Sequence, residues 1–155
     1  MAEPHLSVEI LTITGSDSVD KRDWRRLYDG YGAFYKREMT DAIADTVWNW
    51  IHDPAHEVEG AVAKLDGRVV GLAHYRRMPS PLRGQNIGFL DDLFVDPDVR
   101  GHGVAEALFG HLATVAEERG WGVVRWITAD DNYRARSLYD RLSKKTTWNL
   151  YEMSV

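Results

Sequence analysis

The spacing of hydrophobic and polar residues changes along the chain, and each change predicts a new kind of element. Residues 8–14 (VEILTIT) alternate apolar and polar side chains and are rich in β-branched residues, which predicts a first strand. From about Asp20 the apolar side chains recur every three or four residues, which predicts a helix. Gly30 and Gly32 count against this helix, because glycine costs about 1 kcal/mol relative to alanine in a helix interior.

A second helix, capped by Thr40 and stopped by Pro54, is expected before alternation returns. Residues 58–65 and 69–75 then predict two strands. The dipeptide Asp66-Gly67 between them is a favoured two-residue hairpin turn, so the two strands are expected to pair with each other.

The rest of the chain continues this mixture of strands and helices. The remaining expected elements are a loop over residues 78–84 with two prolines, a strand over 87–95, a helix that ends at Gly120, a strand over 123–128, a short helix after Asn132 and a strand over 148–153. The complete order predicts an α/β (α+β) fold, with a mixed sheet and helices on both of its faces. At 155 residues the chain fits a single domain, residues 1–155, that is large enough to bury a core.

Composition excludes several classes of protein. The sequence has no cysteine, so disulfides, thiolate metal sites and thiol nucleophiles are excluded, and a cytoplasmic location is expected. A formal net charge of −5 argues against a nucleic-acid binder, which needs lysine and arginine to replace phosphate counterions. No apolar run is long enough to cross a bilayer, and residues 1–10 lack the pattern of a signal peptide, so no membrane partner is expected.

Candidate chemistry begins where a strand gives way to the third helix, at RGHGVA, residues 100–105. The small residues Gly101, Gly103 and Ala105 let a ligand approach the backbone, and the unpaired amides of a helix start attract a phosphate or pyrophosphate. Arg100 adds a fixed positive charge. The alternative is that the two glycines only shape a surface turn. The segment has neither the third glycine of a dinucleotide-binding fold nor the Gly-Lys-Ser/Thr ending of a P-loop.

This segment resembles the coenzyme A signature of the GNAT acetyltransferase superfamily, R-x-x-G-x-A after a strand that ends in Leu-Phe-Val and a Val-Asp-Pro-Asp turn. Residues 132–139 (NYRARSLY) are similar to the second signature of that superfamily, N-x-x-A-x-x-L/F-Y. The run FLDDLFV, residues 89–95, is similar to the corresponding strand of spermidine/spermine acetyltransferases. Residues 24–35 and 138–153 resemble small members that acetylate free amines, and the core of the resemblance covers residues 87–142.

The resemblance implies a mostly antiparallel sheet and an acetyl-CoA-dependent N-acetyltransferase. Such an enzyme transfers an acetyl group to the primary amine of a small molecule, a polyamine or similar, by direct attack in a ternary complex. It also implies a homodimer. The glycine loop would hold the pyrophosphate of acetyl-CoA, and the end of the preceding strand would pair with its pantetheine arm. The residues expected to bind the cosubstrate are Leu93, Phe94, Val95, Arg100, Gly101, His102, Gly103, Val104, Ala105 and Asn132, of which Asn132 could instead only cap its helix.

Three residues are candidates for proton transfer. A substrate amine is mostly protonated near neutral pH, and a carboxylate can accept its proton directly or through water. Asp91 and Asp92 point to opposite faces of a regular strand, so one of them is expected to reach the acceptor and the other could be exposed or cap a backbone group. The resemblance places an acidic pair of this kind at the amine site, with glutamate usual where this chain has Asp91. Tyr139 occupies the superfamily's position for the acid that protonates the leaving thiolate, with core packing as its alternative.

Other aromatic and histidine side chains allow two interpretations each. His74 is a further candidate acid or base, although a hydrogen-bonded strand histidine is the simpler interpretation. His52 and His56 have a metal-like spacing, but Pro54 lies between them and no metal site is expected. The candidates to line the acceptor site form one row of the first helix, a pattern that is more often core: Trp24, Tyr28, Tyr31 and Tyr35.

Two other functions stay open. A protein acetyltransferase would acetylate a lysine or an N-terminus, and it would need an open groove for its peptide. A non-catalytic sensor of acyl-CoA would need the glycine loop alone, and the presence of Tyr139 with the pair Asp91 and Asp92 argues against it.

Overall fold

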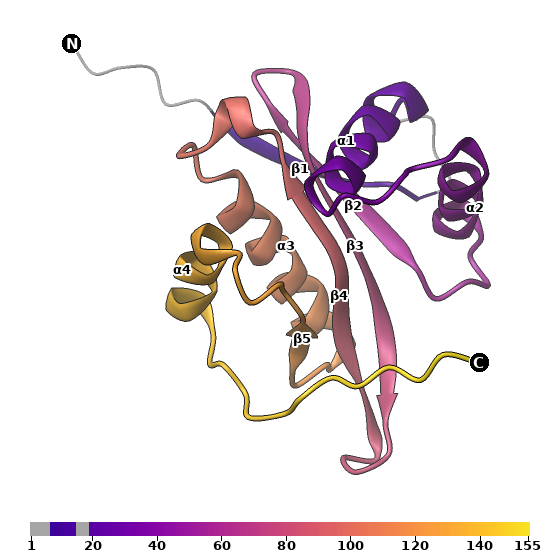
Figure 1. Ribbon diagram of the computed structural model, residues 1–155, viewed down its shortest axis with the longest axis vertical. Helices are drawn as coiled ribbons and strands as arrows, with labels where there is room; N and C mark the ends of the chain where they lie inside the picture. The colour runs from indigo at the N-terminus through magenta and orange to yellow at the C-terminus, as the bar shows by residue number, and fades with distance from the viewer. Residues whose placement is uncertain (1–6, 15–18) are drawn as a thin grey trace.

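The computed structural model describes residues 7–14 and 19–155, and within them a five-stranded sheet lies between two pairs of helices (Figure 1). The sheet order follows the sequence, β1-β2-β3-β4-β5. The first four strands pair antiparallel and β5 pairs parallel to β4, which confirms a mixed, mostly antiparallel α/β fold. The elements are β1 (Val8–Thr12), α1 (Lys21–Phe34), α2 (Asp41–His52), β2 (Glu59–Leu65), β3 (Arg68–Ser80), β4 (Gln85–Val95), the 3-10 helix η1 (Pro97–Val99), α3 (Val104–Arg119), β5 (Val124–Trp126) and α4 (Tyr133–Leu142).

Local capping signals place several of these elements where the sequence predicts them. The side chain of Asp20 accepts a hydrogen bond from the amide of Arg22 at the start of α1, and Thr40 accepts one from Ile43 at the start of α2. Gly120 ends α3 in the left-handed conformation that glycine adopts without strain. These ends are therefore fixed by hydrogen bonds and backbone preferences close by in the chain.

The β2–β3 hairpin closes as its turn residues predict. Asp66 and Gly67 have φ values of 53° and 77°. A type I′ turn requires a positive φ at both central residues, and Asp-Gly is one of the pairs that satisfies it.

Each face of the sheet carries its own core. The side chains of α3 pack on one face around Leu108 and Leu112, while α1 and α2 pack on the other around Trp24 and Leu72. Figure 1 shows α4 beside α3, with α1 and α2 on the opposite side. None of the helices within residues 7–14 and 19–155 is both long and apolar enough to cross a bilayer.

Two expected elements differ in the structure. The loop expected over residues 78–84 is shorter, because β3 continues through Pro79 to Ser80 and pairs with β4 as far as Gln85. Beyond Tyr75 no β2 residue pairs with β3, so this part of β3 is an edge strand, where proline is tolerated.

The strand expected over residues 148–153 does not form. A strand is stabilised by hydrogen bonds to a neighbouring strand, and among the described residues no strand pairs with this segment. Its apolar side chains are largely exposed, with Trp148 at 76% and Leu150 at 68%. Figure 1 shows this segment running from α4 past the sheet to the C-terminus.

Candidate active site

A β-bulge in the centre of the sheet changes the face on which one of the candidate carboxylates lies. His74 pairs with Asp92, and the next residue of β3, Tyr75, pairs with Leu90, so Asp91 is an extra residue in β4. An extra residue breaks the alternation of side chains along a strand. Asp91 and Asp92 therefore both lie on the α1 face, where regular alternation predicts one on each face.

Asp92 is held by donors from two other elements. Its Oδ2 accepts from Nδ1 of His74 on β3 at 2.8 Å and from the hydroxyl of Tyr28 on α1 at 3.1 Å. Burial opposes ionisation of Asp92, but hydrogen bonding from His74 and the nearby hydroxyls of Tyr31 and Tyr28 outweighs it and holds the pKa of Asp92 below its usual value. Asp92 is therefore a firmly ionised and firmly oriented carboxylate.

The pKa of Asp91 is shifted in the opposite direction. Burial raises the pKa of Asp91 above its usual value, although the guanidinium of Arg76 opposes this shift. Nε of Arg76 donates to Asp91 Oδ2 at 3.0 Å, and both side chains are 31% exposed. A partly exposed carboxyl with a raised pKa is better matched to accept and release a proton near neutral pH than Asp92 is.

Arg76 was not among the predicted site residues. It lies two positions after His74 on β3 and stacks over the ring of Phe89 on β4, with its Cζ 4.9 Å from the ring centre. Because side chains two apart in a strand share a face, the position of His74 was the signal that could have identified Arg76.

The aromatic row of α1 divides into a buried part and an exposed part. Trp24 has no exposed surface, so in this structure it is a core residue and cannot line an open acceptor site. Tyr28, Tyr31 and Tyr35 continue as a chain of contacting rings, 5.8 Å and 4.9 Å apart between centres, and the exposure of the last reaches 36%. This row leads from Asp92 towards the end of α1.

Tyr139 of α4 lies at the other end of that row. Its ring packs edge-on against Phe109 of α3 and Trp126 of β5. Burial, with a contribution from Tyr35 nearby, raises the pKa of Tyr139 to about 12. The hydroxyl thus stays protonated over the whole physiological range, as a proton donor must, while the ring serves the packing role that was its alternative.

The glycine loop has the backbone that its sequence predicts. Gly101 and Gly103 have φ values of 86° and 76°, and a Cβ at either position would meet nothing within 4 Å. Both glycines are thus required by the backbone conformation and leave open space in front of it. Gly103 caps α3 without any side-chain hydrogen bond, which leaves the first amides of that helix free for an anion.

The side chains of the loop differ in exposure. Arg100 and His102 are exposed, and Ala105 is half-buried. Val104 is 2% exposed and packs in the core under α3, so this residue can offer a ligand only its backbone.

β4 has a free edge beside this loop. β5 pairs with Gly88–Leu90 and, within the described residues, with no later part of β4. The backbone of Leu93, Phe94 and Val95 is therefore open on that edge to an extended ligand. Asn132 makes no capping bond with its side chain, whose Nδ2 instead donates to Thr128 at 3.3 Å.

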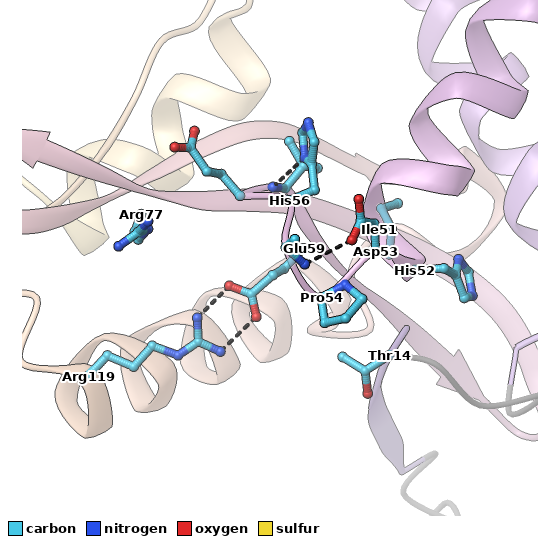
Figure 2. Close-up of a pocket in the computed structure, with 12 residues that line it drawn as sticks. Thr14, Ile51, His52, Asp53, Pro54, His56, Glu59, Arg77 and Arg119 are labelled. Carbon is cyan, nitrogen blue, oxygen red and sulfur yellow. Dashed lines mark hydrogen bonds and ion pairs between the residues drawn. The ribbon is translucent and has the colours of Figure 1, made fainter.

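A surface hollow lies elsewhere on the molecule. It has a volume of about 600 Å³ at the junction of α2 and β2, where Arg119 forms a bidentate ion pair with Glu59 (Figure 2). Asp53, His52 and His56 also line it, and none of the predicted catalytic or cosubstrate residues does. Within residues 7–14 and 19–155 no group of histidine and acidic side chains is arranged to hold a metal ion.

Comparisons with known proteins give matches over most of the chain. Residues 22–143 match the model of the acetyltransferase (GNAT) family. Over 144 residues, 92% of this chain and 89% of the relative, the sequence is 28% identical to the D-amino-acid N-acetyltransferase HPA3 of Saccharomyces cerevisiae.

Two solved structures have the same fold over nearly their whole length. A ribosomal-protein-alanine N-acetyltransferase from Brucella melitensis biovar Abortus 2308 is 25% identical, with a TM-score of 0.78 over 96% of this chain and 99% of that one. The aminoglycoside N-acetyltransferase AAC(6')-Iy, solved in complex with CoA, is 18% identical, with a TM-score of 0.81 over 99% of both chains. The chain therefore belongs to the acetyltransferase (GNAT) family and is an acetyl-CoA-dependent N-acetyltransferase that acts on amines.

Proposed function

We propose that the acceptor of this N-acetyltransferase is the primary amine of a small molecule, which attacks the acetyl group directly while both substrates are bound. The observation that carries the proposal is the bulge at Asp91, which turns two carboxyls towards the same face beside the tyrosines of α1. Two carboxyls on one face attract and orient a cationic amine.

The chain's own residues divide the work of proton transfer. Acetyl-CoA supplies the acetyl group as a reactive thioester. Asp91 accepts the proton that the amine must lose, because its raised pKa suits that role, while Asp92 is the fixed negative charge that orients the amine. Tyr139 donates a proton to the leaving sulfur. Residues 100–105, the free edge of β4 and Asn132 hold the cosubstrate.

Two kinds of small amine fit this site for different reasons. A diamine or polyamine would place a second ammonium group against Asp92, whose pKa is held low. An amino acid would place its carboxylate against Arg76, whose terminal nitrogens have no hydrogen-bond partner within residues 7–14 and 19–155. The relative named as a D-amino-acid N-acetyltransferase supports this second candidate.

Lysine and its decarboxylated form, cadaverine, distinguish these candidates because they differ by one carboxylate. The kcat/KM of the protein is measured with both, with spermidine and with a basic peptide, by colorimetric detection of released thiol. Since the chain has no cysteine, it adds no thiol background. A higher value for spermidine or cadaverine supports a polyamine, and a higher value for lysine supports an amino acid.

The matched variants are Arg76→Gln and Arg77→Gln. Arg77 is the next residue on β3 and lines the hollow of Figure 2, which Asp91 does not line. If Arg76 binds a carboxylate, Arg76→Gln lowers the lysine-to-cadaverine ratio of kcat/KM by about tenfold, and Arg77→Gln leaves the ratio unchanged. A basic peptide that surpasses every small amine would overturn the small-molecule proposal in favour of a protein acceptor.

We also propose that the protein is a homodimer in which residues 148–155 of one copy cover the open edge of β5 in the other. Among the residues that the structure describes, β5 is an edge strand with one unpaired side, and an exposed edge is a template for another strand. The segment exposes Trp148, Leu150, Tyr151 and Met153, which supplies the apolar surface that a subunit interface buries.

A further inference from the structure

Three side chains from three elements form a hydrogen-bonded chain that ends at the acceptor carboxylates. Nε1 of Trp24 on α1 lies 3.0 Å from Nε2 of His74 on β3, and Nδ1 of His74 lies 2.8 Å from Oδ2 of Asp92 on β4. Trp24 has no exposed surface, the side chain of His74 is 1% exposed and that of Asp92 is 18% exposed. The chain thus runs from the core to the edge of the proposed amine site.

The chemistry of the indole ring fixes where the proton of His74 lies. The indole N–H can only donate, so Nε2 of His74 must accept and carries no hydrogen. The ring proton is therefore on Nδ1, which donates it to Asp92. A doubly protonated ring would set an Nε2–H against the indole N–H, donor against donor, inside the core.

We propose that Trp24 is a positioning residue of the acetyl transfer, which holds His74 as the neutral Nδ1–H tautomer so that Asp92 keeps one orientation and its whole negative charge. This inference rests on the proposed role of Asp92 in orienting a cationic amine. Neither Trp24 nor His74 touches the substrate, and both act through the carboxylate.

Charged and titratable groups surround His74 on several sides. Asp92 and Asp91 face it from β4, Arg76 lies two residues further on its own strand, and Tyr28 contacts its ring from α1 with centres 4.8 Å apart. On β2, His74 pairs with Gly60, which carries no charge. On α1, Tyr31 lies behind Tyr28. On α2, the titratable side chain of His52 is separated from Trp24 by Trp48. With two carboxyls beside it, a His74 freed from Trp24 would be drawn to take up a second proton.

Such a second proton would change the site in a specific way. An imidazolium paired with Asp92 cancels the charge that attracts the amine, so the KM for a cationic amine rises as the pH falls. The turnover number at saturating amine changes little, because Asp91 and Tyr139 are untouched. A purely structural loss would lack this dependence on pH.

The variant that removes the donor is Trp24→Phe, and its matched control is Trp48→Phe. Trp48 packs on Trp24 with ring centres 5.0 Å apart, so its replacement disturbs the same aromatic cluster while the bond to His74 stays. The ring nitrogens of His74 are observed by long-range ¹⁵N–¹H NMR between about pH 5 and pH 8, where a histidine ordinarily changes charge. The signals are assigned by their loss in His74→Asn.

In the parent and in Trp48→Phe, we expect a hydrogen on Nδ1 and none on Nε2, because the indole N–H of Trp24 donates to Nε2. In Trp24→Phe, His74 becomes doubly protonated as the pH falls, and the KM of a cationic amine rises about tenfold at the acid end. The double variant with Trp24→Phe and His74→Asn has no ring to protonate, so the dependence of its KM on pH returns to that of His74→Asn alone.

Two results would overturn the proposal. One is a parent protein in which Nε2 of His74 carries a hydrogen, and this reading is decisive even if Trp24→Phe does not fold. The other is a rise in KM that persists in the double variant, since packing alone would then explain it. The NMR spectra need no turnover, so failure of this inference is distinguishable from failure of the proposed acceptor.

Discussion

The carboxyls of Asp91 and Asp92 lie on one face of the sheet, yet their pKa values shift in opposite directions. Burial dominates at Asp91, whereas at Asp92 the contacts with His74, Tyr31 and Tyr28 together outweigh burial. As the pH falls, Asp91 is therefore protonated first, at a higher pH than an ordinary aspartate. Protonation of Asp91 therefore removes the proposed base, while Asp92 keeps its negative charge.

The variant Asp91→Asn tests whether Asp91 is the base that accepts the proton of the amine. We expect a lower kcat/KM for amines at neutral pH and a pH optimum shifted upwards, because without the base the amine must lose its proton to solvent, which requires a more alkaline medium. The control is Asp29→Asn, which breaks an arginine–aspartate pair of similar length, 2.8 Å, on α1. An unchanged pH profile of kcat/KM in Asp91→Asn would exclude Asp91 as the base.

Tyr139→Phe removes one hydroxyl and keeps the ring that packs on Phe109 and Trp126. If Tyr139 is the general acid, kcat falls by about 10²-fold or more while the affinity for CoA stays the same. Tyr133→Phe, at the exposed start of the same helix, is the control and keeps full activity. Equal turnover in Tyr139→Phe and the parent, with chemistry rate-limiting, would leave Tyr139 with its packing role.

The glycine loop at the junction of β4 and α3 is the segment that we propose holds the pyrophosphate of acetyl-CoA. Gly103→Glu puts a carboxylate into the open space before the amides of this loop, and we expect it to abolish the rise in melting temperature that acetyl-CoA causes in the parent. Gly67→Glu is a close control, because Gly67 has φ 77° against 76° at Gly103 and is equally open. If both variants keep the same stabilisation by acetyl-CoA, the loop is not the pyrophosphate site.

The glycines inside helices show how closely elements approach. A Cβ on Gly30 of α1 would lie 2.8 Å from the ring of Phe94 on β4, whereas one on Gly110 of α3 would meet nothing within 4 Å. We expect Gly110→Ala to raise stability by about 0.5–1 kcal/mol, the gain in helix propensity, and Gly30→Ala to lower it despite the same gain. Thermal or urea unfolding measures both, and a stabilised Gly30→Ala would show that Phe94 moves aside freely.

The assembly of two copies is the prediction that concerns the whole molecule. Charged substitutions at Trp148 and Leu150, each to glutamate, should convert the proposed dimer to monomer in size-exclusion chromatography with light scattering. Leu82→Glu is the control, since Leu82 is apolar and 93% exposed but lies at the β3–β4 turn. A parent that is already monomeric at high concentration would exclude the proposed dimer.

Much of this molecule follows from short stretches of sequence. The start of a helix near Asp20, the cap at Thr40, the turn at Asp66-Gly67 and the glycine loop at 100–105 were all predicted, because each depends on hydrogen bonds and backbone preferences within a few residues. The resemblance to the acetyltransferase family depended on the same kind of local signal, and the family match confirmed it.

The arrangement of the acceptor side was decided by contacts between distant residues. The bulge at Asp91 depends on how β3 and β4 pair, and a shift of one residue in that register turns a side chain to the other face. The burial of Trp24, its bond to His74 and the pairing of Arg76 with Asp91 join residues up to 50 positions apart in the chain. Alternation along a single strand carries no information on a partner strand, so only the tertiary structure could place both carboxylates on one face.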